Sequence, residues 1–228
     1  MQAVIMAAGE GKRMRPLTET KPKPLIEVGG KPLIEHVLDA LPKEIDEVII
    51  VLGYKGDMIR ERLGNSYNGL PIKYVHQWMQ AGTAHALSLA RPFLSGRFLL
   101  LNADDILGRE AIEEAVKHPL SIMAIRHDDP SKFGVIKVRD NGTMESIVEK
   151  PQEFIGSLVS TGAMVIDDRI FGYDVAKHEA AGEYFMTDPL GKMAAEHPIL
   201  VIEQPVYIPV GYPEDIPKAE ARLKELGR

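Results

Sequence analysis

A short segment near the start of the chain combines small residues with positive charges, an arrangement that suits phosphate. Residues 6–18 read MAAGEGKRMRPLT and follow directly on AVIM, an apolar run typical of a strand. Backbone N–H groups beside glycine and alanine can approach phosphate oxygens closely, and neighbouring cations add charge-assisted hydrogen bonds. The small residues and cations of the segment are Ala8, Gly9, Gly11, Lys12, Arg13 and Arg15. We therefore predict a loop that binds nucleotide phosphates.

The order of the residues, more than the glycine pair, makes this prediction specific. Gly-x-Gly alone describes many tight turns whose basic residues are only solvated. The segment is neither a Walker loop nor the dinucleotide pattern G-x-G-x-x-G, because Met14 stands at the third glycine position. The strings RMRPLT at 13–18 and KPKPL at 21–25 follow in fixed order, and the second adds the cation Lys23. This cluster of cations favours a nucleoside triphosphate, which carries several negative charges.

Two adjacent carboxylates follow an apolar run farther along the chain. Residues 99–107 read LLLNADDIL, which predicts a buried strand that ends in Asp104 and Asp105. Open α/β sheets place their ligands at the carboxyl ends of strands, and Mg²⁺ prefers oxygen ligands and triphosphate substrates. On physical grounds either carboxylate is a candidate for a Mg²⁺ site.

Together these strings resemble the N-terminal signature of the sugar-1-phosphate nucleotidyltransferases, G-x-G-x-R-[LM]-x-P-L-T followed by PKPL. The matching residues are Gly9, Gly11, Arg13, Met14, Pro16, Leu17 and Thr18, then Pro22, Lys23, Pro24 and Leu25. The resemblance implies an enzyme that transfers a nucleoside monophosphate from a triphosphate to a sugar 1-phosphate and releases pyrophosphate. It implies that Arg13 stabilises the departing pyrophosphate and that Lys23 neutralises charge at the α-phosphate. The family's N-G-D string aligns Asp104, rather than Asp105, with its metal-binding aspartate.

A further segment resembles the part of the family that binds the nucleobase. Residues 75–87 read VHQWMQAGTAHAL, similar to the family's Q-x-x-P-L-G-T-A. The resemblance implies that Gln77 reads the edge of the base, while Gly82 and Thr83 let the base lie against the backbone. A glutamine side chain offers both a donor and an acceptor for this purpose.

Segments of the second half resemble the family's sugar-phosphate site. The strings are FGVIKV at 133–138, IVEKP at 147–151, STGAMVI at 160–166 and GEYFMTD at 182–188. The resemblance implies that Lys150 binds the phosphate of the sugar. It implies that Gly134, Glu149, Thr161 and Gly162 contact or border the sugar. It also implies that Glu183, Thr187 and Asp188 lie near the sugar or organise its loop.

The chain departs from the family in its last motif, W-x-D-V-G-T-P-E-D. Residues 207–215 read YIPVGYPED, with Pro209 in place of the second metal-binding aspartate and Tyr212 in place of threonine. Proline has no carboxylate, but Mg²⁺ keeps waters and takes substrate phosphates, so one protein ligand fewer need not abolish its binding. Two alternatives stay open: a non-catalytic, regulatory relative that binds nucleotide sugars, and a cytidylyltransferase acting on a phospho-alcohol. A glycosyltransferase shares the broad fold but would not need the arrangement of Arg13 and Lys23. Arg13 and Lys23 favour catalysis, because pure binding hardly requires a cation at the departing pyrophosphate.

The elements that would position these residues alternate in the first half of the chain. Strands are predicted from apolar runs at 3–6, 47–52, 72–75 and 98–101, and helices from amphipathic stretches at 32–41, 57–63 and 83–90. This alternation predicts the α/β class, with a Rossmann-like, mostly parallel mixed sheet flanked by helices.

The second half has a more antiparallel character. Asn141-Gly142 predicts a hairpin turn. Strands are predicted at 121–126, 134–138, 144–149, 163–166 and 206–210, and helices around 170–177, 189–196 and 216–226. We expect a single domain over 1–228, with a nucleotide-binding half at about 1–118 and a sugar-phosphate-binding half at about 119–228.

Composition narrows the partners and the setting. The formal net charge of −6 argues against a nucleic-acid binder, and the absence of cysteine excludes disulfides and thiolate metal sites. No apolar run approaches the ~20 residues of a membrane span, and the N-terminal run is too short for a secretory signal. We expect a cytoplasmic monomer or homodimer that binds a nucleoside triphosphate and a sugar 1-phosphate, with Mg²⁺ as cofactor. The C-terminal β-helix of many relatives is expected to be absent.

Overall fold

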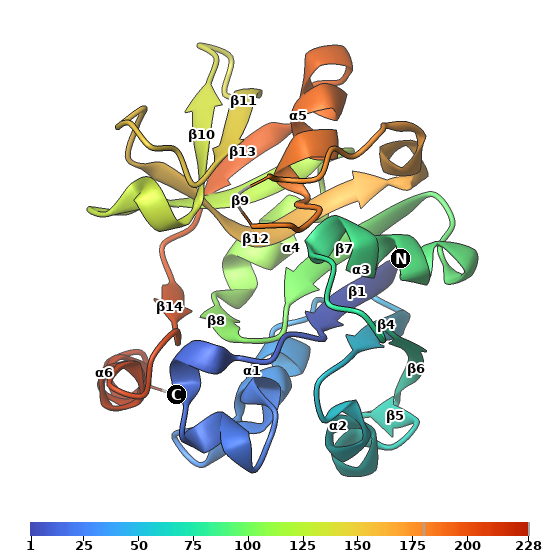
Figure 1. Cartoon of the computed structure of the whole chain (residues 1–228), viewed down its shortest axis with the longest axis vertical. Coiled ribbons are helices and arrows are strands. Elements are labelled where there is room, and N and C mark those ends of the chain that lie inside the picture. The colour runs from blue at the N-terminus through green and yellow to red at the C-terminus, as the bar shows by residue number, and fades with distance from the viewer. Residues whose placement is uncertain (180, 228) are drawn as a thin grey trace.

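A ten-stranded mixed sheet runs through the molecule (Figure 1). The computed structural model describes residues 1–179 and 181–227. Four parallel strands form one part of the sheet, in the spatial order β7 (Arg97–Asn102), β1 (Gln2–Ala7), β4 (Glu47–Leu52) and β6 (Leu70–His76). The central strands β1 and β4 are apolar and largely buried on both faces, as parallel strands between two layers of helices must be.

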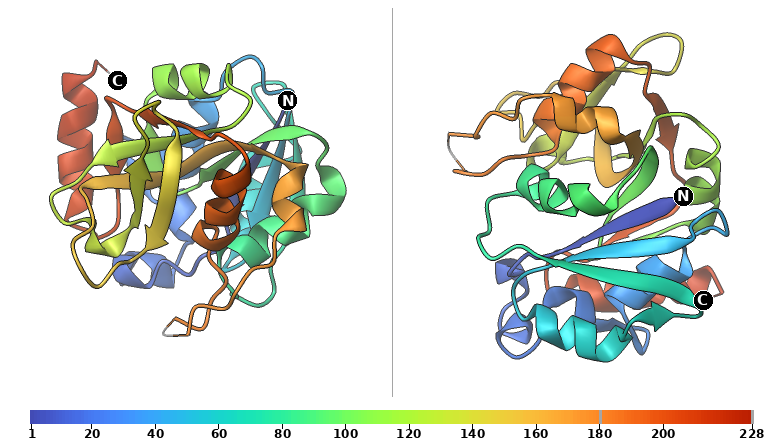
Figure 2. Two further views of the ribbon diagram at one scale, coloured as in Figure 1. Left: turned by 90° about the horizontal axis from the view of Figure 1, so that it is seen from above. Right: turned by 90° about the vertical axis from the view of Figure 1, so that its right-hand side faces the viewer.

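Helices cover both faces of the ten-stranded sheet. One face carries α1 (Leu33–Asp39), α2 (Gly56–Leu63) and α4 (Arg109–Ala115). The other carries α3 (Thr83–Ala90), which packs on the parallel strands, and α5 (Thr187–Glu196), which packs on β11 (Met144–Glu149). Successive residues of β1 point to opposite faces, so that Ile5 packs into the first core and Val4 into the second. In the right-hand view of Figure 2, α3 (green) lies above the parallel strands and α2 (cyan) below them.

Antiparallel strands extend the sheet beyond β7. Strand β12 (Leu158–Asp167) pairs with β7, with Met164 opposite Leu100. The antiparallel strands β9 (Ser121–Arg126), β10 (Gly134–Val138) and β11 (Met144–Glu149) belong to this part, and β13 (Leu200–Glu203) pairs with β9 in parallel. Strand β5 (Ser66–Tyr67) ends the opposite edge. The register of β12 against β9 shifts between Ser160 and Met164. Irregularities of this kind re-aim side chains and backbone, and this one contains the Thr161-Gly162 pair.

A later segment returns to the beginning of the chain. Strand β14 (Tyr207–Pro209) pairs with β8 (Asp105–Leu107), and α6 (Asp215–Glu225) follows it. A third core cluster joins this segment to the loop after β1 and to the small hairpin of β2 (Glu27–Val28) and β3 (Lys31–Pro32). Members of this cluster include Met14, Val28, Ile106, Ile208, Val210 and Leu223. Figure 1 shows β14 and α6, in red, beside the blue N-terminal loop.

The α/β class and most predicted elements are confirmed. The strands at 47–52, 121–126, 134–138 and 144–149 and the helix at 83–90 have the predicted bounds. The helix predicted at 170–177 is wrong, because a 3-10 helix over Asp168–Gly172 gives way to irregular chain. Its apolar residues Ile170, Phe171 and Val175 pack against the second core without helical continuity.

The prediction that Asp105 ends the strand after Leu99 also needs correction. Strand β7 ends at Asn102, and Asp105 begins the separate strand β8. Strand β8 was not predicted, because three residues are too few to show a period and its partner β14 is remote in sequence. Asp104 therefore lies in the turn between β7 and β8.

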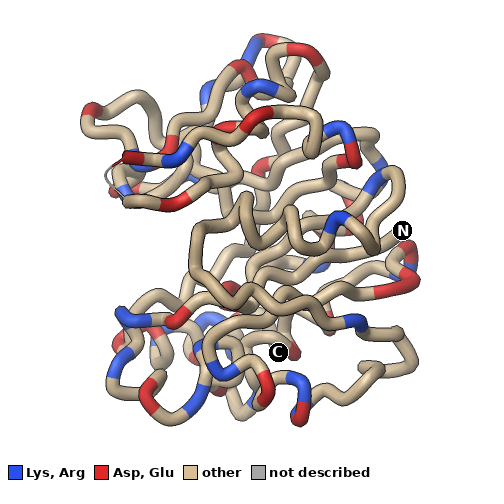
Figure 3. The backbone as a smooth tube through the Cα atoms, turned by 45° about the vertical axis from the view of Figure 1, so that its right-hand side comes forward, with Lys and Arg blue, Asp and Glu red and all other residues tan. Residues whose placement is uncertain are grey.

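The surface carries charges of both signs. Figure 3 shows acidic and basic residues interspersed along the backbone in that view. The chain has 33 acidic against 27 basic residues, which gives the net charge of −6. Within residues 1–179 and 181–227, no helix combines the length and apolar character that crossing a membrane requires.

Candidate active site

Two adjoining cavities open at the carboxyl ends of β1 and β7. The chain order of the parallel strands reverses between these two strands, which is where open α/β sheets bind their ligands. The loop-side cavity, of about 480 Å³, is lined by residues 6–14 and by side chains between Gln77 and Ala86. The strand-side cavity, of about 550 Å³, is lined by β10, β11, β12 and the start of α5. Both cavities share Met6, Arg13, Lys23, Thr83, Asn102, Asp104 and Gly211.

The Gly-rich loop, residues 8–14, presents backbone donors to the loop-side cavity. Across the described chain, the N–H groups of residues 9–12 find no protein acceptor. The loop is held at Gly11, whose carbonyl accepts from the Thr18 hydroxyl at 3.1 Å and from the Met14 N–H at 2.9 Å. Gly11 has a φ of 63°, and a Cβ there would lie 2.9 Å from the Cβ of Lys23. Any other residue at position 11 would be strained, and the loop keeps adjacent N–H groups available for an anion.

An ion pair marks the junction of the two cavities. Lys23 Nζ lies 2.6 Å from a carboxylate oxygen of Asp104. The Lys23 side chain is only 9% exposed, whereas that of Asp104 is 36% exposed and opens into both cavities. A lysine this buried must be paired, because an isolated buried ammonium costs several kcal/mol in desolvation. The pair places one cation and one carboxylate where ligands of the two cavities would meet.

Gln77 is buried at the far end of the loop-side cavity with a fixed amide. The side chain is 5% exposed, and its Nε2 donates to the Gly82 carbonyl at 3.1 Å and lies 3.0 Å from Nδ1 of His85. Both partners can accept, so the amide nitrogen is engaged and the Oε1 acceptor is left for the cavity. Gly82 is required because its φ is 99° and its Cα approaches the backbone of Tyr184 too closely for any Cβ.

Thr83 joins the two parts of the site through the backbone. Its hydroxyl accepts from the Met186 N–H at 3.0 Å, and the Ala84 N–H donates to the Tyr184 carbonyl at 2.9 Å. The start of α3 is thereby tied to the segment that leads into α5. Thr83 lines both cavities, so a ligand that extends from one to the other would pass this residue.

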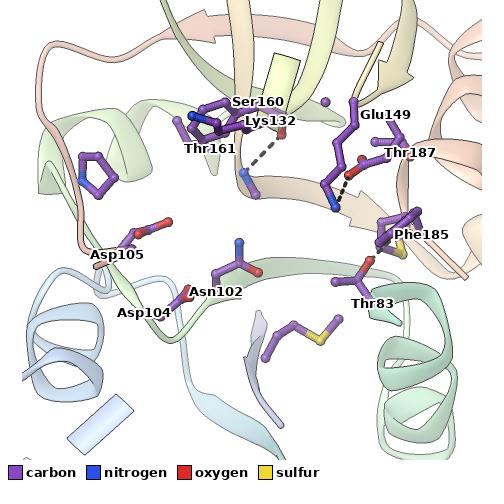
Figure 4. Close-up of a pocket in the computed structure, with 18 of the residues that line it drawn as sticks. Thr83, Asn102, Asp104, Asp105, Lys132, Glu149, Ser160, Thr161, Phe185 and Thr187 are labelled. Atoms are coloured by element: carbon purple, nitrogen blue, oxygen red, sulfur yellow. Dashed lines mark hydrogen bonds and ion pairs between the residues drawn. The ribbon is translucent and has the colours of Figure 1, made fainter. Parts of the chain in front are cut away.

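The strand-side cavity holds a cation at the end of β11. Lys150 has a φ of 43°, and its Nζ lies 3.6 Å from the Glu149 carboxylate and 4.7 Å from the centre of the Phe185 ring. A second cation, Lys132, also lines this cavity and pairs with Asp129 at 2.8 Å. Figure 4 shows Glu149 and Thr187 on one side of the cavity, facing Asn102 and Asp104 on the other. With Arg13 and Lys23, which also line this cavity, a phosphate-bearing ligand would meet four cations.

Thr161 contributes to this cavity in a different way from the neighbouring glycine. The residue is 3% exposed, and its hydroxyl donates to the Met123 carbonyl at 3.1 Å and accepts from Nε2 of Gln204 at 2.8 Å. Its polar group is thus engaged inside the protein and is not available as a donor to a ligand. Gly162, with a φ of 75°, presents backbone at the same place.

The two adjacent aspartates have different surroundings. Both oxygens of Asp105 accept hydrogen bonds, from the Tyr207 hydroxyl at 2.9 Å and from the Val210 N–H at 3.3 Å. Burial and the neighbouring Asp104 carboxylate raise the pKa of Asp105 to about 7. Burial and the Asp105 carboxylate raise the pKa of Tyr207 well above its ordinary value, so Tyr207 remains a neutral donor. Asp105 therefore ties β8 to β14.

These surroundings test whether the site suits Mg²⁺. Among the described residues, no cluster of three or more aspartate, glutamate, histidine or cysteine side chains could form a closed metal cage. Pro209 faces Asp105 in the β8–β14 register and lines the cavity without a ligand atom. The open carboxylate of Asp104 is compatible with Mg²⁺, which commonly uses one or two carboxylates together with substrate phosphates.

The structure brings the residues predicted from the sequence to the two cavities. The predicted nucleotide-binding residues that line the loop-side cavity are Ala8, Gly9, Gly11, Lys12, Gln77, Gly82 and Thr83. The predicted sugar-phosphate-binding residues that line the strand-side cavity are Gly134, Glu149, Lys150, Thr161 and Gly162. The three predicted catalytic residues, Arg13, Lys23 and Asp104, line both.

Two other predicted residues lie outside the strand-side cavity, and two cavity residues were missed. Glu183, expected near the sugar or in the organisation of its loop, lines the loop-side cavity. The Asp188 carboxylate, with the same expectation, accepts from the Ala176 N–H at 2.6 Å and lines neither cavity. Asn102 and Lys132 were not predicted. Asn102 lies in the segment LLLNADDIL, where a polar residue at the end of an apolar strand indicates a site. No sequence pattern around Lys132 indicated that it lines the cavity.

Comparison with known proteins agrees with this geometry. The Nucleotidyl transferase family matches residues 2–223. The chain is 34% identical to the UTP–glucose-1-phosphate uridylyltransferase AglF of Haloferax volcanii, covering 99% of this chain and 97% of that protein. It is 31% identical to the bifunctional protein GlmU of Methanococcus maripaludis, covering 95% of this chain but 53% of that protein.

Solved structures have the same fold. One is assigned as a glucose-1-phosphate thymidylyltransferase from Bacillus anthracis, in complex with sucrose; it matches with a TM-score of 0.87 and 26% identity over 99% of this chain and 96% of that one. A UDP-glucose pyrophosphorylase complexed with UDP-glucose matches with a TM-score of 0.84 over 99% of this chain and 98% of that one. At 21% identity, the second match supports the fold alone.

Proposed function

This chain belongs to the nucleotidyl transferase family, and we propose that it transfers a nucleoside monophosphate from UTP or dTTP to a hexose 1-phosphate. The products are a nucleoside diphosphate sugar and pyrophosphate. The observation that carries the proposal is that Arg13, Lys23 and Asp104 line both cavities. A group passed from a ligand in one cavity to a ligand in the other would cross at these three residues.

The loop-side cavity suits the triphosphate. The free N–H groups of residues 9–12 and the cations Lys12 and Arg13 line this cavity and would bind the β- and γ-phosphates. The Gln77 Oε1 faces the cavity as an acceptor, and the N3–H of uracil or thymine is the matching donor. The relatives named above that act on UTP or carry thymidylyl in their names support the same base class.

The strand-side cavity suits the sugar 1-phosphate. Lys150 would hold the phosphate, and the Glu149 carboxylate with backbone at Gly134 and Gly162 would contact hydroxyl groups. Glucose 1-phosphate in the names of AglF and of the Bacillus anthracis protein supports a hexose. The Thr161 hydroxyl bonds to Met123 and Gln204 inside the protein, so Thr161 would stabilise the cavity wall and not bind the sugar.

The reaction is an in-line displacement at the α-phosphorus. An oxygen of the sugar phosphate forms the new P–O bond, the bond from the α-phosphorus to the bridging oxygen breaks, and pyrophosphate leaves with the electron pair. Arg13 and the loop N–H groups stabilise the charge that grows on pyrophosphate, and Lys23 offsets charge at the α-phosphate. Asp104 would hold Mg²⁺, which supplies further positive charge beside the phosphates when bound. Positioning and electrostatics supply the rate without a covalent intermediate.

The test is a pyrophosphate-release assay of ATP, GTP, CTP, UTP and dTTP against several sugar 1-phosphates, with Mg²⁺. We expect turnover with UTP or dTTP and a hexose 1-phosphate, and much weaker turnover with CTP and ATP. Calorimetry with the corresponding nucleotide sugars runs in parallel.

Pro209 gives one alternative specific support, because the family's second metal ligand is missing there. A non-catalytic relative would bind nucleotide sugars and release no pyrophosphate with any pair. That outcome would overturn the enzymatic proposal. Turnover with CTP and a phospho-alcohol would instead identify a cytidylyltransferase.

A further inference from the structure

Arg13 is held by an aromatic ring instead of a carboxylate. Its guanidinium carbon lies 5.3 Å from the centre of the Tyr212 ring, within the range of a cation–π contact. In the described chain, the Arg13 side chain makes no hydrogen bond or ion pair with another residue. The neighbouring cations differ, because Lys12 and Arg15 both pair with the carboxylate of Glu10.

The Tyr212 ring projects from a fixed turn. The Asp215 carboxylate accepts from the Gly211 N–H at 3.0 Å and from the Tyr212 N–H at 2.9 Å, and the Asp215 N–H donates to the Tyr212 carbonyl at 3.0 Å. The turn follows β14, and Val210 packs in the same core cluster as Met14, the residue after Arg13. The ring and the guanidinium thus belong to one packed unit.

A ring and a carboxylate would hold an arginine with different consequences. A carboxylate neutralises the charge and occupies N–H donors at the edge of the guanidinium. A ring carries no neutralising charge and no carboxylate oxygen, so the full charge of the guanidinium and its N–H donors stay available for phosphate. This is the state that a cation serving a departing pyrophosphate requires.

We propose that Tyr212 is a positioning residue that holds the Arg13 guanidinium, through the face of its ring, where the pyrophosphate part of the nucleotide binds. This proposal rests on the proposed function. It gives a role to the second departure from the family motif, the tyrosine where threonine is usual.

The test is a double-mutant cycle between Arg13→Ala and Tyr212→Leu, measured by calorimetric binding of inorganic pyrophosphate with Mg²⁺ and by steady-state kinetics. We expect Tyr212→Leu to weaken pyrophosphate binding and lower kcat by about fivefold, with the KM for the sugar 1-phosphate unchanged. Tyr212→Phe keeps the ring and should behave like the wild type. In the Arg13→Ala background, Tyr212→Leu should have no further effect.

A matched control comes from another arginine–tyrosine pair. The Arg60 guanidinium lies 5.8 Å from the centre of the Tyr74 ring, and neither residue lines either cavity. Tyr74→Leu should therefore leave pyrophosphate binding unchanged.

If the Tyr212→Leu variant does not fold, Tyr212→Thr is used in its place, because it also removes the ring.

Three outcomes would overturn the proposal: wild-type affinity in the Tyr212→Leu variant, effects of the two substitutions that add independently, or a Tyr212→Phe variant as weak as Tyr212→Leu. Failure of the proposed function is separate, because pyrophosphate binding is measured without turnover. A wild-type chain that transfers nucleotide but binds no pyrophosphate would overturn the role of Tyr212 alone.

Discussion

Replacing Pro209 by aspartate would place a third carboxylate beside Asp104 and Asp105. Pro209 faces Asp105 across the antiparallel pair of β14 and β8, so the two side chains share one face of the ribbon at about 5 Å. Two unit charges at this distance repel by about 3 kcal/mol at an effective dielectric constant of about 20, and by about 1 kcal/mol in water. Because Pro209 is exposed and the pKa of Asp105 is about 7, the comparison is made above about pH 8, where Asp105 is ionised. There we expect Pro209→Asp to be about 1–3 kcal/mol less stable than Pro209→Asn in EDTA.

Mg²⁺ should reverse this order, because an added carboxylate beside Asp104 completes a pair of ligands. A ligand that binds only the folded state at 100 times its Kd stabilises it by about 2.7 kcal/mol. The assay is chemical denaturation of both variants and the wild type, in EDTA and in millimolar Mg²⁺, with Pro209→Asn as the neutral control that also lacks the proline ring. Equal stabilities of the two variants in EDTA would refute the proximity of position 209 to Asp105. An equal gain in stability of the two variants on addition of Mg²⁺ would refute the assignment of a metal site beside Asp104 and position 209.

Three further substitutions follow from the contacts of the site. Gln77→Leu removes the acceptor for the base and leaves the Gly82 carbonyl without its hydrogen-bond donor. In steady-state kinetics the KM for UTP should rise about tenfold while the KM for the sugar 1-phosphate stays constant. Parallel increases in both KM values would contradict the assignment of Gln77 to the base. Gly11→Ala forces a Cβ against Lys23 at a φ of 63°, and thermal denaturation should show a loss of at least about 1 kcal/mol, whereas wild-type stability would contradict the argument. Thr161→Val removes the hydroxyl that links the Met123 carbonyl and the Gln204 amide, and should cost about 1–3 kcal/mol of stability. The KM for the sugar 1-phosphate should change less than about twofold. Unchanged stability with a large rise in this KM would mean that the hydroxyl faces the sugar.

The sequence was most informative where burial imposes a pattern. Strand β4 has the predicted bounds because a run that is apolar on both faces can only be the interior of a covered sheet. Strand β8 could not be predicted, since its hydrogen bonds depend on a partner about a hundred residues away. The helix predicted at 170–177 is wrong because the spacing of apolar residues indicates which side chains are buried. Here they are buried without forming an α-helix.

The same distinction applies to the site. Gly11 and Lys23 stand in strings whose residue order carries information, and the contact between them explains why both types are needed. The contact of Arg13 with Tyr212, the engaged amide of Gln77 and the inward hydroxyl of Thr161 are not encoded locally. Each depends on which remote segment lies opposite, and only the folded chain supplies that partner.

The packing of β14 and α6 against the Gly-rich loop has a consequence for biosynthesis. The Gly29 N–H donates to the Glu220 carboxylate, across a separation of 191 residues. At ribosomal rates of about 5–20 residues per second, roughly 10–40 s separate the appearance of these two partners. The parallel strands can pair while synthesis continues, but the loop that follows β1 lacks part of its packing surface until β14 and α6 have left the ribosome. A nascent chain would therefore form its parallel strands early and complete its nucleotide-binding loop late.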